Sequence, residues 1–187
     1  MALAELFPVA ARRGPGAAWA WLALLLVAAA VSSVTFACVT PFAAFAVLTA
    51  ATLPLPRALG AMVAVWLVNQ ALGFCALGYP LDGSTLAWGG ALGVAALAAT
   101  LGSAAAIAMT PGLWPRLALG FVAAFGVYEG LLYLAALGLG GTENFSPAIV
   151  AKVALSDAAW LLGLVILRHL LSHLPSASRT NRHPVTT

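Results

Sequence analysis

One stretch of this 187-residue chain, Asn69–Gly83, contains an unusual variety of polar and reactive side chains. Its sequence is NQALGFCALGYPLDG. Two amides, a thiol, a phenol and a carboxylate lie there, in a chain made mostly of Ala, Leu, Gly and Val. Cys75 is the most reactive of them, because a thiolate binds soft and borderline metals and takes part in redox chemistry. One cysteine cannot enclose a metal by itself, but it can supply one axial ligand to a metal that a macrocycle already holds.

Two simpler interpretations of Cys75 stay open at the level of sequence. Cysteine is often a small, buried, apolar residue. Cys75 could also form a disulfide with Cys38, since both residues are predicted near the outer side of a membrane, where disulfides persist. Sequence does not give the distance between the two sulfurs, so ligation, packing and a disulfide are all retained.

Three ionisable residues lie inside apolar segments, where a charge at the bilayer centre costs at least ~2.5–3.5 kcal/mol. They are Glu129, Lys152 and Asp157. Glu129 could pair with a cation or stay protonated, and the two acids form either structural polar contacts or part of a ligand or ion site. His169 and His173 are one helical turn apart and could hold a metal, but a position at the membrane headgroups is the simpler interpretation.

Composition identifies the chain as a membrane protein. Apolar residues make up 63% of it and charged residues 7%, and the mean hydropathy is +1.04, whereas soluble domains carry about 25% charged residues. The net charge of +3 comes from basic residues scattered at the ends of apolar segments. That pattern is typical of orientation in a lipid bilayer and not of a phosphate-binding face, so no nucleic-acid partner is expected.

A helix needs about 20 apolar residues to cross a hydrocarbon core of ~30 Å. The sequence predicts an all-α bundle of six transmembrane helices in a single membrane domain over residues 1–187, with a short or broken second helix and a disordered tail over 172–187. The predicted spans are 17–37, 41–53, 57–78, 86–109, 115–139 and 147–171.

Orientation follows from arginine, because cytoplasmic loops are enriched in basic residues. With six crossings all seven arginines fall on one side, so both termini are predicted to be cytoplasmic. The arginines are Arg12, Arg13, Arg57, Arg116, Arg168, Arg179 and Arg182. The residues predicted at the outer side are Cys38, Cys75, Tyr79, Asp82, Glu143, Asn144 and Phe145.

Small residues recur at a spacing of four, a pattern that lets membrane helices approach closely. The pairs are Ala28 with Ser32, Ala29 with Ser33, Gly89 with Gly93, and Gly102 with Ala106. Packing within the bundle is the simpler interpretation, and a docking surface along the first span is the alternative. The tryptophans predicted to lie in the interfacial aromatic belt are Trp19, Trp21, Trp88 and Trp114.

The architecture over residues 15–172 resembles the substrate-binding S-components of energy-coupling factor vitamin transporters. A cysteine at the outer end of the third span, here in GFCALGYPLDG, resembles the BtuM-type cobalamin transporters of Gram-negative bacteria. The resemblance implies an inner-membrane protein that binds cobalamin in a cavity open to the periplasm, with the cobalt ligated by the Cys75 thiolate. It also implies loss of the cyano ligand from cyanocobalamin.

The expected contacts to the corrin follow from predicted outer location, and they are Tyr79, Asp82, Asn144 and Phe145. S-components dock onto an energising module through small residues of the first helix. The candidates for that role here are Ala28, Ala29, Ser32 and Ser33. BtuM-type proteins are thought to work without a dedicated module, so the need for this partner stays open.

Two other hypotheses are retained. One is an S-component-like transporter for a different vitamin or a metal ion, in which Cys75 only packs. The other is a non-transporting membrane subunit or assembly factor that binds a partner helix through Gly- and Ala-rich faces. An intramembrane enzyme ranks lower, because the sequence has no paired-histidine zinc motif, no GxSxG and no CxxC.

Overall fold

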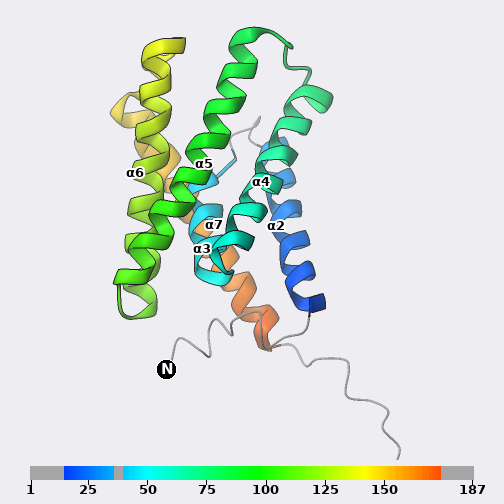
Figure 1. Ribbon diagram of the computed structural model, residues 1–187, viewed down its shortest axis with the longest axis vertical. Coiled ribbons are helices and arrows are strands. Elements are labelled where there is room, and N and C mark those ends of the chain that lie inside the picture. Colours follow the sequence, from blue (N-terminus) through cyan, green and yellow to red (C-terminus); the bar gives the residue numbers. More distant parts are fainter. Residues whose placement is uncertain (1–14, 36–39, 174–187) are drawn as a thin grey trace, which may run out of the picture.

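The computed structural model describes residues 15–35 and 40–173, and within these ranges the chain is helical with no strand (Figure 1). Four helices are long and apolar enough to cross a membrane, namely α4 with the π-helical turn that extends it, α5, α6 and α7. The predicted all-α membrane bundle is therefore confirmed. The elements are α2 (Pro15–Thr35), α3 (Phe42–Thr52), α4 (Leu55–Ala71), η2 (Leu72–Ala76), α5 (Gly83–Met109), α6 (Leu113–Leu139), η3 (Thr142–Phe145) and α7 (Pro147–His173).

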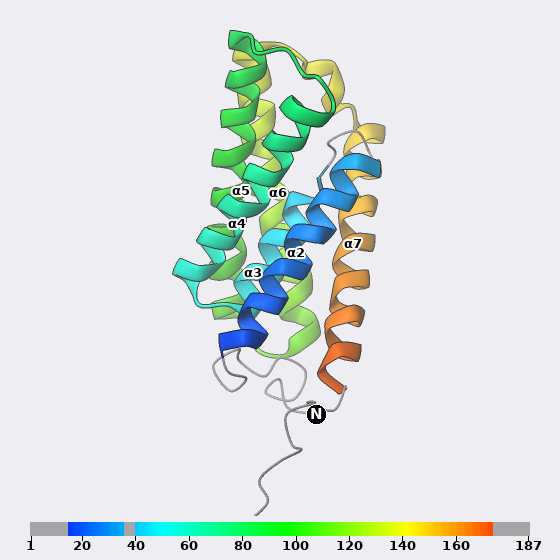
Figure 2. The same cartoon turned by 90° about the vertical axis from the view of Figure 1, so that its right-hand side faces the viewer.

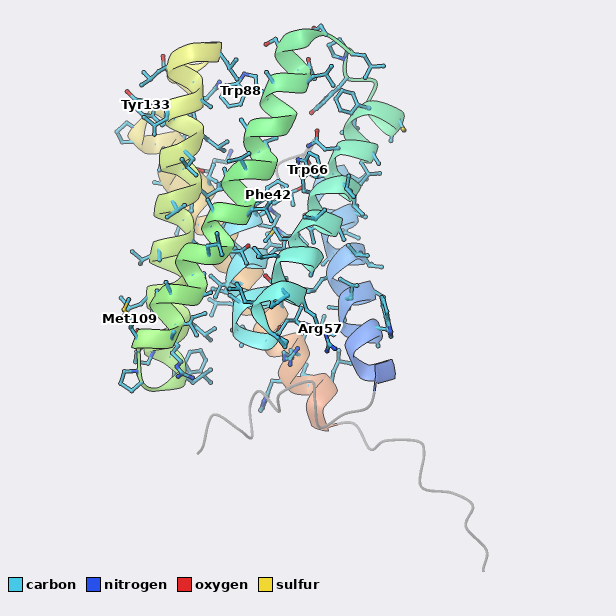
Figure 3. The ribbon with its side chains drawn as sticks, viewed as in Figure 1. Phe42, Arg57, Trp66, Trp88, Met109 and Tyr133 are labelled. Carbon is cyan, nitrogen blue, oxygen red and sulfur yellow. The ribbon has the colours of Figure 1, made fainter. Side chains whose placement is uncertain are left out.

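The bundle has two distinct ends (Figures 1 and 2). At the upper end, here called the loop end, residues 77–82 join α4 to α5 and residues 140–146 join α6 to α7. At the lower end, here called the tail end, α2 begins and α7 finishes. Arg57 and Met109 lie toward the tail end, and Trp88 and Tyr133 lie near the loop end (Figure 3).

The short second helix of the prediction is α3, and it forms the centre of the bundle. It has 11 residues, which corresponds to a length of about 16 Å, roughly half of the hydrocarbon thickness. It begins about half-way along the molecule and runs toward the tail end (Figure 2). Most of its side chains are buried, and α4, α5, α6 and α7 all pack against it. An apolar helix covered on all sides needs no lipid contact, so its short length is tolerated.

Glycines let the other helices approach closely, as the small-residue spacing predicts. A Cβ on Gly93 of α5 would lie 2.9 Å from the indole of Trp66 on α4. A Cβ on Gly102 would lie 3.2 Å from Val127 of α6. The packing interpretation is therefore confirmed for these two positions.

The prediction that Trp21 lies in the interfacial aromatic belt is wrong. It is buried, and its Nε1 donates a hydrogen bond to Thr52 Oγ1 at 3.1 Å. The guanidinium of Arg168 lies over its ring at 4.4 Å. Trp21 thus links α2, α3 and α7 at the tail end, because its polar N–H finds a partner inside the protein. Trp19 and Trp114 are exposed, as the prediction requires.

When α4 and η2 are taken as one span, the helix bounds agree with the predicted spans to within about three residues. The largest difference is α5, which starts at Gly83. Residues 172 and 173 belong to α7 and not to a tail. The remainder of the predicted tail, together with Cys38, lies outside the described residues.

Candidate functional site

Cys75 lies on the π-helical turn η2 that ends α4. After this turn Gly78, with a φ of 68°, reverses the chain, and Tyr79 N donates a hydrogen bond to Gly73 O at 3.0 Å. Cys75 is a free, exposed thiol. It is therefore neither a buried packing residue nor part of a disulfide. π-Helical turns are rare and occur often at functional sites, because the widened turn changes where side chains point.

Asp82 has a local structural role at the start of α5. Its Oδ1 accepts a hydrogen bond from Thr85 N at 2.7 Å, which is the arrangement of a helix N-cap. This backbone hydrogen bond lowers the pKa of Asp82 below its usual 3.8. The role accounts for the residue without a ligand. Tyr79, three positions earlier, is 40% exposed beside it in the chain.

Asn144 and Phe145 lie in the other loop, on the 3-10 turn η3. The ring of Phe145 packs edge-on against Tyr133 of α6, with centroids 5.5 Å apart. Asn144 N donates a hydrogen bond to Gly141 O at 3.1 Å, and the residue is exposed. Trp88 of α5 covers this loop, since a Cβ on Gly141 would lie 3.7 Å from its indole.

The two loops lie on opposite flanks of α5 at the loop end (Figure 1). The turn η2 packs against α2 and α4, whereas η3 packs against α6 and α7. Within the described residues the structure thus groups Cys75 with Tyr79 and Asp82 along one segment. It groups Asn144 with Phe145 on the other segment.

A buried hydrogen-bond network lies between α2, α3 and α4. Asn69 is 3% exposed, and its Nδ2 donates to Thr40 Oγ1 at 2.8 Å and to Ser33 Oγ at 3.4 Å. Ser33 and Thr40 also share a hydrogen bond of 2.7 Å. Gln70 Nε2 donates to Asn69 Oδ1 at 3.1 Å. Asn69 and Gln70 therefore hold the chain just before α3, a role that their position in the sequence did not predict.

A second polar group lies at the N-terminus of α3. Asp157 of α7 is 3% exposed, and its Oδ2 accepts a hydrogen bond from Ala43 N at 3.0 Å. The ring of Tyr128 on α6 packs against Phe42, the first residue of α3, with centroids 5.6 Å apart. Glu129 follows Tyr128 and is half-buried. The two acids noted at membrane depth thus belong to helices that both border the start of α3.

Lys152 and the two histidines that could hold a metal form no closed site in the described residues. Lys152 is exposed on α7, and His169 is half-buried near the tail end of the same helix. In residues 15–35 and 40–173 there is no group of three His, Cys, Asp or Glu that could hold a metal ion. The side chain of His173 lies outside the described residues.

An apolar groove of about 210 Å³ lies between α4 and α5. Its lining is almost wholly apolar. The one polar side-chain atom of Trp66, Nε1, already donates a hydrogen bond to Gly89 O at 2.9 Å. A vitamin site needs polar groups that orient the ligand, and this groove offers none in the described part of the chain. The lining residues are Met62, Val63, Trp66, Gly90, Gly93, Val94 and Leu97.

The small residues of the first span face mainly inward. Ala29, Ser32 and Ser33 are fully buried, and Ser32 Oγ donates to Ala29 O at 2.9 Å. Ala28 is half-buried. The exposed face of α2 includes Val27 and Val31, together with two alanines, Ala20 and Ala23.

No protein-family model, no curated protein and no solved structure matches this chain.

Proposed function

We propose that the protein binds cobalamin at the loop end and takes it up across the bacterial inner membrane, with the Cys75 thiolate as a ligand to cobalt. The observation that carries the proposal is the free, exposed thiol on the π-helical turn. A thiolate is a strong donor for a soft or borderline metal. The corrin ring holds the cobalt, so the protein has to supply only one axial ligand.

The direction of uptake is inferred from the distribution of charge. The described arginines, Arg57, Arg116 and Arg168, belong to helix termini at the tail end. By the positive-inside rule that end faces the cytoplasm and the loop end faces the periplasm. Cys75 would then meet a ligand arriving from outside.

The loop around Cys75 offers apolar surface for the face of a corrin. Leu77, Tyr79 and Leu81 are all exposed there. Asn144 and Phe145, on the other flank of α5, would contact only a ligand wide enough to span the loop end. Asp82 Oδ1 already accepts a hydrogen bond from Thr85 N. Asp82 could therefore accept a hydrogen bond from a corrin amide only through its remaining oxygen lone pairs.

Ligation of cobalt by Cys75 would also promote decyanation of cyanocobalamin. The thiolate donates an electron pair to cobalt on one axial face, and this weakens the bond to cyanide on the other. Cyanide leaves as CN⁻ with the electron pair of the broken bond, so the oxidation state of cobalt does not change. An energising module, if one takes part, would meet the exposed face of α2 around Val27 and Val31, because Ala29, Ser32 and Ser33 are buried.

The test is the absorption spectrum of purified protein mixed with cyanocobalamin. We expect a shifted corrin band in the wild type and in Cys38→Ser, no shift in Cys75→Ser, and slow loss of the cyano signature in the two proteins that keep Cys75. An unshifted spectrum in the wild type, or an equal shift in Cys75→Ser, would refute cobalt–thiolate ligation.

A further inference from the structure

Glycines of α5 and a tryptophan of α4 shape the apolar groove between these two helices. Gly90 and Gly93 line the groove and contribute no side chain to it. Trp66 projects from α4 toward α5 (Figure 3), and a Cβ on Gly93 would lie 2.9 Å from its indole. Trp66 Nε1 also donates a hydrogen bond to Gly89 O at 2.9 Å. One wall of the groove is therefore an aromatic ring that α5 holds in place.

The groove lies at the depth of the hydrocarbon core. Its residues on α5 run from Gly90 to Leu97, which are seven and fourteen residues after the first residue of that helix. At 1.5 Å per residue they lie about 10 and 21 Å along a helix of about 40 Å. Val94 of α5 is 65% exposed and Val63 of α4 is 38% exposed, and both helices are long and apolar enough to cross a membrane. The groove is therefore continuous with the interface between the protein and the lipid acyl chains.

Neither water nor a polar ligand suits this lining. The one side-chain nitrogen among the lining residues is Trp66 Nε1, which already has its partner. Apolar cavities of this kind stay free of water, because a buried water needs two to four polar partners. An empty groove, in turn, leaves its walls without dispersion contacts. Hydrocarbon is therefore the occupant that the lining favours.

The size of the groove favours an acyl chain over a partner helix. Its volume is about 210 Å³. A helix is about 10–12 Å wide, so a 10 Å length of one fills on the order of 800 Å³. Carbon atoms in contact lie about 3.5–4.0 Å apart, so a 10 Å length of one hydrocarbon chain fills on the order of 100–200 Å³. The groove has room for one such chain and not for a helix.

We propose that the groove between α4 and α5 binds one acyl chain of a membrane phospholipid, which lies along Trp66 and over Gly90 and Gly93. The chain binds through dispersion contacts, because a bilayer provides no hydrophobic driving force for apolar groups that leave the lipid. The bound chain supplies the packing that α5 lacks at its two glycines. The headgroup lies outside this contact, since the groove is at hydrocarbon depth. This inference does not depend on cobalamin.

Gly90→Leu is the variant that tests the site, because the leucine side chain enters the groove from α5. A Cβ at Gly90 has no atom of a neighbouring element within 4 Å, so the variant is expected to fold. Gly130→Leu of α6 is the matched control, since Gly130 is also exposed, has equally open surroundings and does not line the groove. Each protein is measured with and without Trp66→Phe, and the difference gives the fluorescence of Trp66 alone.

The measurement is quenching of Trp66 fluorescence in phosphatidylcholine vesicles that contain a rising fraction of phosphatidylcholine brominated on its acyl chains. Bromine quenches an indole only at close range, so quenching reports a chain against the ring. We expect Trp66 to be quenched in the wild type and in Gly130→Leu, and the quenching to be largely lost in Gly90→Leu. The proposal is overturned if Trp66 is not quenched in the wild type, which is the result expected if a second copy or a partner helix covers the groove. It is also overturned if Gly90→Leu is quenched as strongly as Gly130→Leu.

Discussion

Two helices of this protein have an aspartate at their N-terminus, but the aspartates reach the helix from very different distances along the chain. At α5 the aspartate is Asp82, which lies three residues before the amide that it binds and is exposed at the loop end. At α3 it is Asp157, which lies 114 residues away from its partner and is buried between helices. Both carboxylates accept one backbone N–H, at 2.7 Å and 3.0 Å.

The comparison separates a local contact from a tertiary one. If Asp82 were removed, water could solvate the exposed amide of Thr85. Water cannot do so at Ala43, because α3 is covered by its neighbours. A buried donor without a partner bears its full desolvation cost, whereas an exposed donor does not. The same chemical group should therefore matter much more at α3 than at α5.

Asp157→Leu should have the largest effect on stability. The leucine fills a similar volume but leaves Ala43 N–H without a partner, which costs about 1–3 kcal/mol. We expect a lower unfolding temperature in detergent, and Asp157→Asn, which keeps an acceptor oxygen, should lose less. An unchanged unfolding temperature in Asp157→Leu would mean that α3 does not need this hydrogen bond.

Asn69→Leu should have the next largest effect, because it removes the other long-range attachment of the chain before α3. Two donated hydrogen bonds are lost, at about 0.5–1.5 kcal/mol each, while Ser33 and Thr40 still bind each other. Chemical denaturation of the purified protein measures the loss. Gln70→Leu is the control, and it should cost less because Gln70 is only half-buried. Equal losses in the two variants would contradict the proposed anchoring role of Asn69.

Asp82→Ala should have the smallest effect. Since the folded-state pKa of Asp82 is lowered below 3.8, its ionised form stabilises the fold. That contribution is complete at pH values above 3.8, and it is lost as the pH falls through the lower folded-state value. Unfolding measured against pH should therefore give a small difference between wild type and Asp82→Ala at neutral pH, which shrinks in acid. A difference that grows in acid would contradict this assignment.

The helices themselves were predictable from the sequence. The apolar runs predicted a short helix over residues 41–53, and the structure has one over Phe42–Thr52. The start of α5 was predicted late, although Asp82 followed by Gly, Ser and Thr is a recognisable N-cap signal that could have corrected it. The exposure of Cys75 was not predictable, because it depends on a π-helical turn that has no simple sequence signature.

Hydropathy and local residue preference determined the all-α class, the approximate helix bounds and the clustering of arginine at helix termini, because these depend on neighbours within one or two turns. Only the tertiary structure decided that Asp157 meets Ala43, that Asn69 turns inward to Thr40, and that Cys75 faces outward. Glu129 and Asp157 were visible as acids in apolar segments. The position of Asp157 beside the start of α3 results from the packing of α7 against α3, and no single segment contains that information.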